Sequence, residues 1–141
     1  MSKTNTIPSV QNVNNVDGAI TNATGTAKIT VWTAGANDAV LKALGCSNTD
    51  TAAHIVQIFV NIGGSVTFRL LGSVMVAASA GNDGTTAAAD ILRSGMLPWL
   101  SIDAYGNQVF NAKAGTTIKI STTAAAASGK ELDFFGEGGD F

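Results

Sequence analysis

The chain has few of the side chains on which most enzymes and metal proteins depend. Its 141 residues include one histidine, one cysteine and one tyrosine. Because Cys46 is alone, an intramolecular disulfide is impossible and a cysteine-based zinc site is not expected. His54 begins a β-branched run, so a catalytic role would need a nucleophile or carboxylate brought to it by the fold. We predict no enzyme, catalytic residue, cofactor or metal, and we interpret His54 as a hydrogen-bonded residue at a strand edge.

Charge is also scarce, because Asp, Glu, Lys and Arg make up 13% of the chain against about a quarter in an average protein. Eight basic and ten acidic residues give a net charge of −2, which offers no attraction to nucleic acid or to anionic lipid. No apolar run approaches about twenty residues, and residues 1–17 lack the apolar centre of a signal peptide. We therefore expect no nucleic-acid partner, no membrane partner and no conventional secretion.

Glycine is plentiful, and two glycine clusters need an interpretation. Gly81–Gly84 and Gly136–Gly139 both lack the lysine that follows a phosphate-binding loop. Asn82, Asp83 and Asp90 do not have the spacing of an EF-hand calcium loop. We interpret both clusters as turns, in which glycine and Asn-Asp supply left-handed backbone conformations.

The length fits one domain. Residues 1–17 are rich in Asn, Ser and Thr and predict an extended N-terminal arm, either disordered alone or ordered on a neighbour. Residues 18–141 form the single predicted domain.

Short segments of period two, separated by turn residues, predict β-strands in that domain. In Lys28–Thr33, Ile29 and Val31 share one face and Trp32 lies on the other, wet face. Residues 54–62 and 65–70 flank Gly63-Gly64 and predict a hairpin with a two-residue connection. The predicted inward residues of this hairpin are Val56, Ile58, Val60, Ile62, Val66, Phe68 and Leu70.

Later segments repeat the pattern, with Leu100, Ile102, Ile118, Ile120, Leu132 and Phe134 facing inward. Asp38–Leu44 fits both periods and is assigned to a strand, because Gly45 follows at once. Residues 85–93 predict a short helix inside a long connection, and residues 124–127 predict a loop. The sum is an all-β chain of about eight short strands, an antiparallel β-sandwich of jelly-roll type with a long loop, a short helix and the arm.

Three segments carry a resemblance to a known group. They are Thr30-Val-Trp-Thr-Ala-Gly-Ala-Asn-Asp38, Ala114-Gly-Thr-Thr-Ile-Lys-Ile-Ser-Thr-Thr-Ala124 and Gly138-Gly-Asp-Phe141. Their "TAGAN" loop, "AGTT" turn and "GGDF" tail resemble small structural proteins of tailed bacteriophages. The similarity extends over most of residues 27–141, and the arm departs from it.

The resemblance implies a capsid decoration, or cement, protein that stabilises the phage head. Its partners would be the major capsid protein and itself, as a homotrimer. It would be located on the capsid exterior, after assembly in the host cytoplasm. Such proteins act by burying surface against several capsid subunits at once, which multiplies weak affinities.

Six residues are candidates for such an interface: Trp32, Phe59, Arg69, Leu71, Trp99 and Phe135. Five of them are too apolar for the wet face of a strand, and Arg69 is placed to pair across an interface. The alternatives are a satellite core for Phe59 and Trp99, and a solvated surface position for Arg69. Two other functions stay open: a tail or head-fibre component, and a carbohydrate-binding module that uses Trp32, Trp99 and Tyr105 as sugar platforms.

Overall fold

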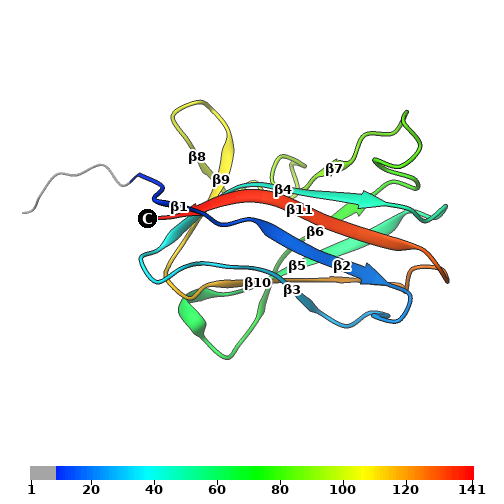
Figure 1. Ribbon diagram of the computed structural model, residues 1–141, viewed down its shortest axis with the longest axis horizontal. Coiled ribbons are helices and arrows are strands. Elements are labelled where there is room, and N and C mark those ends of the chain that lie inside the picture. The colour runs from blue at the N-terminus through cyan, green and yellow to red at the C-terminus, as the bar shows by residue number, and fades with distance from the viewer. Residues whose placement is uncertain (1–8) are drawn as a thin grey trace, which may run out of the picture.

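The computed structural model describes residues 9–141, and strands dominate that range (Figure 1). Its one helical element is a short 3-10 turn, η1 (Ile62–Gly64). None of the helical structure in residues 9–141 is long and apolar enough to cross a membrane. The prediction of an all-β chain with two antiparallel sheets is confirmed.

The first sheet, here called sheet A, contains the first and last strands of the described chain. Its central strand β11 pairs on one side with β1 and β2 and on the other side with β4, which in turn pairs with β7 and β9. All of its pairings are antiparallel, and β8 extends it beyond β9. Its strands are β1 (Asn12–Val13), β2 (Val16–Thr21), β4 (Ala39–Asn48), β7 (Ala89–Asp90), β8 (Ser101–Ile102), β9 (Gln108–Ala112) and β11 (Glu131–Asp140).

The second sheet, sheet B, has the order β3-β10-β5-β6 and is also antiparallel. Its strands are β3 (Ile29–Thr33), β5 (His54–Asn61), β6 (Arg69–Val76) and β10 (Thr117–Thr122). The two sheets lie one over the other in Figure 1. Buried side chains from both sheets form one core between them, as the near-zero exposure of Leu44, Ile58 and Leu132 illustrates. This is a β-sandwich arrangement, because alternate residues of each strand face the other sheet.

The alternation predicted the core well in the regular strands. Val56, Ile58 and Val60 of β5, Ile118 and Ile120 of β10, and Leu132 and Phe134 of β11 are all buried. Asp38–Leu44 is a strand as predicted, although it begins at Ala39 and runs on to Asn48. Residues 124–127 lie outside every strand and helix, also as predicted.

The predicted hairpin exists, but its connection is longer than the two glycines. β5 ends at Asn61, η1 follows, and β6 begins only at Arg69. Gly63 and Gly64 both have positive φ, so they form part of a tight turn. This turn does not connect β5 directly to β6. Ile62 and Val66, which are predicted to face inward, lie in this connection and are exposed. Leu70, also predicted to face inward, is exposed because a register shift in the β5–β6 ladder places it opposite Phe59.

Two further predictions are wrong. Residues 85–93 form no helix, because Ala89–Asp90 pairs with Gly45–Cys46 of β4 as the short strand β7. Gly136–Gly139 is not a turn, since it forms part of β11. Glycine is needed there because a Cβ at Gly136 would collide with the carbonyl oxygen of Ala43, and one at Gly138 would lie 2.8 Å from that of Val40.

The predicted N-terminal arm, residues 1–17, falls partly outside the described residues. From residue 9 onward this segment lies along β11 of the same chain. The amide of Gln11 donates to the carbonyl oxygen of Asp140 (2.7 Å), and that of Asn14 donates to the carbonyl oxygen of Gly138 (3.0 Å). The described part of the segment is therefore a sheet edge, and β2 begins at Val16, inside the predicted arm.

Candidate interaction surfaces

Several segments that are far apart in the sequence meet at one end of the sandwich. In Figure 1 this is the left-hand end, where β1, the β8–β9 hairpin and the C-terminus lie together, with η1 below them. We call the exposed apolar residues of these segments the end surface: Val10, Val13, Ile62, Val66, Ile102 and Tyr105.

Hydrogen bonds connect four of the segments at this end: η1, the turn before β10, the β3–β4 loop and Phe141. The amide of Gly63 donates to Thr116 Oγ1 (3.0 Å), and the amide of Ala114 donates to Asp38 Oδ1 (2.7 Å). The amide of Phe141 donates to the carbonyl oxygen of Asp38 (3.2 Å). Asp38 adopts a positive φ of 66°, so this carboxylate sits on a sharply turned loop between β3 and β4. These bonds hold the base of this end together through Asp38 and Thr116.

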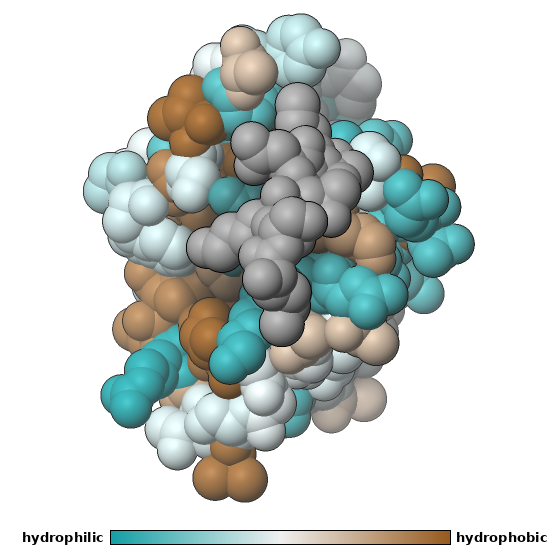
Figure 2. Space-filling view, turned by 90° about the vertical axis from the view of Figure 1, so that its left-hand side faces the viewer, coloured by the Kyte–Doolittle hydropathy of each residue, from teal (hydrophilic) through white to brown (hydrophobic). Residues whose placement is uncertain are grey.

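Several apolar side chains of the end surface are almost fully exposed. Val66 is 97% exposed, Tyr105 is 90% exposed and Val13 is 76% exposed. A groove of about 450 Å³ runs between Val10 and Ile102, and another of about 500 Å³ lies beside Asp38 and Phe141. Figure 2 views this end and shows apolar areas separated by polar ones around the residues drawn in grey. Exposed apolar side chains beside grooves are a common feature of surfaces through which proteins bind one another, so the end surface is a candidate for such a role.

Among the predicted interface residues, Trp32 is placed wrongly by the sequence. It is 2% exposed, and its indole N–H donates to the carbonyl oxygen of Asn14 (3.1 Å). The cause is a β-bulge in β3, where Thr30 pairs with Lys119 and Trp32 pairs with the adjacent Ile118. The extra residue, Val31, breaks the alternation, so both Val31 and Trp32 face the core. Trp32 is a core residue and offers no surface to a partner.

Three of the predicted residues come together on sheet B. Phe59 of β5 pairs with Leu70, and Val60 pairs with Arg69. Phe59 is half-buried beneath the ammonium group of Lys28, which lies 4.2 Å from the ring centroid, and Arg69 is exposed. Leu71 is partly buried and packs against the core, which leaves it a minor contributor to any surface.

The remaining two lie elsewhere. Trp99 is 50% exposed and makes an edge-to-face contact with Phe110 of β9, at a centroid distance of 6.2 Å. Phe135 is 48% exposed on the outer face of sheet A, where its ring covers Gly45. The six residues therefore do not form one site.

The end surface was missed by the sequence analysis, apart from Tyr105, which was considered as a sugar platform. Val66 and Ile102 were assigned to the core because they continue an alternating pattern. The available signal was their position, since each lies beside a glycine- or Asn-rich turn where a strand has to stop.

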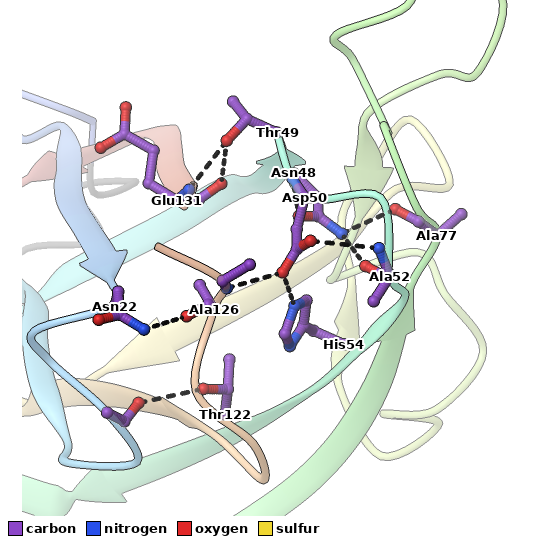
Figure 3. Close-up of polar contacts among 12 residues, drawn as sticks. Asn22, Asn48, Thr49, Asp50, Ala52, His54, Ala77, Thr122, Ala126 and Glu131 are labelled. Atoms are coloured by element: carbon purple, nitrogen blue, oxygen red, sulfur yellow. Dashed lines mark hydrogen bonds and ion pairs between the residues drawn. The ribbon is translucent and has the colours of Figure 1, made fainter. Parts of the chain in front are cut away.

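The opposite end holds a buried polar network around Asp50 (Figure 3). Asp50 Oδ2 accepts hydrogen bonds from His54 Nε2 (2.9 Å) and from the amide of Ala127 (3.0 Å), and Oδ1 accepts from the amide of Ala52 (3.3 Å). The side chain of Asn48 donates to the carbonyl oxygens of Ala52 and Ala77. The network fastens the β4–β5 loop to two neighbouring loops.

This network is closed to chemistry with an external substrate. The side chains of His54 and Asp50 are 5% and 6% exposed, so a substrate has no access to them. Burial, and after it the charge of Asp133, raises the pKa of the Cys46 thiol to about 12, which keeps the thiol protonated and unreactive at neutral pH. Within residues 9–141, no cluster of His, Cys, Asp or Glu is arranged to hold a metal ion.

Acid stability should depend on two carboxylates. Hydrogen bonds from the amide of Ala127 and from His54 lower the pKa of Asp50 to about 2, and the amides of Thr86 and Thr85 lower that of Asp83 to about 2. Both values lie below the ordinary 3.8, so each group stabilises the fold above about pH 4 and loses this effect as the pH falls toward 2. We expect the melting temperature to fall steeply in that window, and less steeply in Asp50→Asn and Asp83→Asn. Calorimetry from about pH 5 down to about pH 2 measures this dependence. An unchanged slope in both variants would contradict the prediction.

Comparison with known protein families, curated proteins and solved structures finds no match for this chain.

Proposed function

We propose that this chain is a capsid decoration protein of a tailed bacteriophage, which binds the outer surface of the major capsid protein shell and stabilises the head. The resemblance carried by residues 30–38, 114–124 and 138–141 supports this proposal. In the structure these three segments have a shared role, because each contributes a strand or turn that leads to the end surface.

The strand order also supports it. Sheet A reads β2-β11-β4-β9 and sheet B reads β3-β10-β5-β6, apart from the short strands. Successive long strands thus change sheet at every step except the β5–β6 hairpin, in the manner of a jelly roll, an architecture common in viral capsid proteins. Fold alone does not establish function, so the proposal depends on the surface.

The observation that carries the proposal is the end surface. Six exposed apolar side chains, two grooves and a hydrogen-bonded base lie at one end of the sandwich. A protein that acts by burying surface against a partner benefits from a preformed patch of this kind, because ordering loops on binding would cost affinity. We assign the end surface to contact with the capsid shell.

Binding to shells tests this assignment. Val66→Asp and Ile102→Asp should each lower the occupancy of purified, expanded shells at least about tenfold at limiting protein, because a carboxylate would be buried without a partner. Ala125→Asp is the matched control, since Ala125 is exposed at the opposite end. Co-sedimentation with shells and densitometry measures the occupancy. Full occupancy by both end-surface variants, or no binding by the unaltered chain, would overturn the assignment.

The two other candidate functions lead to different experimental predictions. A tail or head-fibre component would be found by electron microscopy at the tail or vertex of the particle rather than over the shell. The carbohydrate-binding alternative loses one of its three platforms, because Trp32 is buried. It now depends on Trp99 and Tyr105, and glycan binding that disappears in Trp99→Ala would support it.

A further inference from the structure

The charges of the chain are sorted between its two sheets. The strands of sheet A carry one lysine, Lys42, and six carboxylates: Asp17, Asp90, Glu131, Asp133, Glu137 and Asp140. Within the described chain, the strands of sheet B carry Arg69 and Lys119 and no carboxylate. The small net charge of −2 therefore does not reveal that one sheet is strongly acidic and the other is basic.

The outer side of sheet A has an aromatic ring framed by carboxylates. Along β11, Asp133, Phe135 and Glu137 alternate with the buried Leu132 and Phe134, so they share the outer face. Phe135 pairs with Asp17 on one side and with Gly45 on the other. A groove of about 660 Å³ beside the ring has a largely apolar lining that includes Ala43 and Ala89. We call Asp17, Asp133, Phe135 and Glu137 the acidic face.

The outer side of sheet B has the opposite character. Lys119 alternates with the buried Ile118 and Ile120, and Phe59 alternates with Ile58 and Val60, so both side chains face outward. The ammonium of Lys28 lies 4.2 Å from the Phe59 ring centroid, and that of Lys119 lies 4.6 Å from the Phe68 ring centroid. We call Lys28, Phe59, Phe68 and Lys119 the basic face.

Neither face neutralises its own charge. Among the described residues, the ion pairs are His54–Asp50 and Arg93–Asp90, and neither includes a residue of the two faces. The lysines are held over aromatic rings, which fixes their position while leaving the charge available to a carboxylate.

We propose that these two faces bind each other in successive copies of the chain, the acidic face of one copy on the basic face of the next. Each side offers aromatic surface flanked by charge of one sign, so the pairing is complementary in both respects. The contact joins different surfaces of the two copies, so it is heterologous. Since the faces lie on opposite sides of the sandwich, repetition of the contact extends a row of copies.

This inference goes beyond the proposed function and does not depend on it, because it concerns the purified chain alone. The two are compatible, since the end surface lies between the faces and remains uncovered in such a row. Copies held on a shell by their end surfaces would then meet their neighbours sideways.

Sedimentation of the purified chain tests the contact. At low ionic strength the weight-average mass should rise with protein concentration, and about 0.5 M NaCl should abolish the rise, because the Debye length then falls to a few ångströms. Lys28→Glu/Lys119→Glu and Asp133→Lys/Glu137→Lys should each weaken association at least about tenfold. Lys130→Glu is the control, because Lys130 is an exposed lysine outside both faces. If the double change in sheet A melts early, Glu137→Lys alone replaces it.

Mixing the two double variants gives a sharper test. The first has two acidic faces and the second has two basic faces, so each should be monomeric alone. An equimolar mixture should associate again, with the two variants alternating, because every contact then joins opposite charges. Restored association supports the proposal. A wild-type mass that does not change with concentration, a fixed oligomer insensitive to both double variants, or a mixture that stays monomeric would overturn it.

Discussion

Replacing Trp32 with alanine is expected to lower the free energy of unfolding by about 3–5 kcal/mol, the usual cost of removing a large buried aromatic side chain. The change removes a side chain that is 2% exposed and the hydrogen bond from its indole N–H to Asn14. That bond ties the segment before β2 to sheet B, so we expect the segment to loosen as well. Urea unfolding followed by circular dichroism measures the free energy.

Trp99→Ala is the matched control, because it deletes the same side chain where half of it is in water. We expect it to lower the free energy of unfolding by about 1 kcal/mol. Equal losses in the two variants would show that Trp32 is not the core residue described above. A small loss for Trp32→Ala together with weakened shell binding would restore its first interpretation as an interface anchor.

Gly136→Ala is expected to destabilise the fold by about 3 kcal/mol and to lower the melting temperature by about 10 °C. The added Cβ would collide with the carbonyl oxygen of Ala43 and approach the Cα of Leu44 at 3.1 Å. Both are backbone atoms of β4, so the paired strands would have to separate. Because β4 and β11 form the centre of sheet A, the strain cannot be absorbed at an edge. Differential scanning calorimetry measures the shift.

Gly45→Ala provides the comparison on the neighbouring strand. Its Cβ would meet Phe135 Cε2 at 2.6 Å, which is also a severe overlap. The obstacle is a half-exposed ring that can turn into solvent, so we expect a loss of about 1 kcal/mol or less. If Gly45→Ala proves as damaging as Gly136→Ala, the distinction between a backbone and a side-chain obstacle fails.

The regular strands could be predicted from the sequence because burial there follows a strict period of two. Ile118, Ile120, Leu132 and Phe134 were all placed correctly. The errors arise where the period breaks. The bulge at Val31 reverses the face of Trp32, and no local signal in Lys28–Thr33 distinguishes a bulged strand from a regular one.

Other errors arose where the local composition favours one structure but pairing with a distant strand produces another. Ala87–Leu92 has the composition of a helix, yet Ala89–Asp90 forms a strand because it pairs with β4. Gly136–Gly139 has the composition of a turn, yet the glycines are there because β4 and the segment before β2 approach β11 closely. In both places the deciding partner lies more than forty residues away.

The end surface could not be predicted because it depends on which loops share an end of the sandwich. Val13, Val66 and Tyr105 come from three separate parts of the chain. Each looks ordinary by itself, and only the strand order brings their segments together. The sorting of charge between the sheets is hidden in the same way, because acidic and basic residues are interspersed along the sequence.

The central place of β11 has a consequence during synthesis. Among the described strands β11 comes last along the chain, yet β1, β2 and β4 all form their ladders with it. Until residues 131–140 have left the ribosome, β2 and β4 have open edges with no native neighbour between them. The centre of sheet A can therefore form only once β11 has emerged, by contacts that are distant along the chain and slow to find. A chain that stopped before Glu131 would leave these edges open to pairing with other nascent copies.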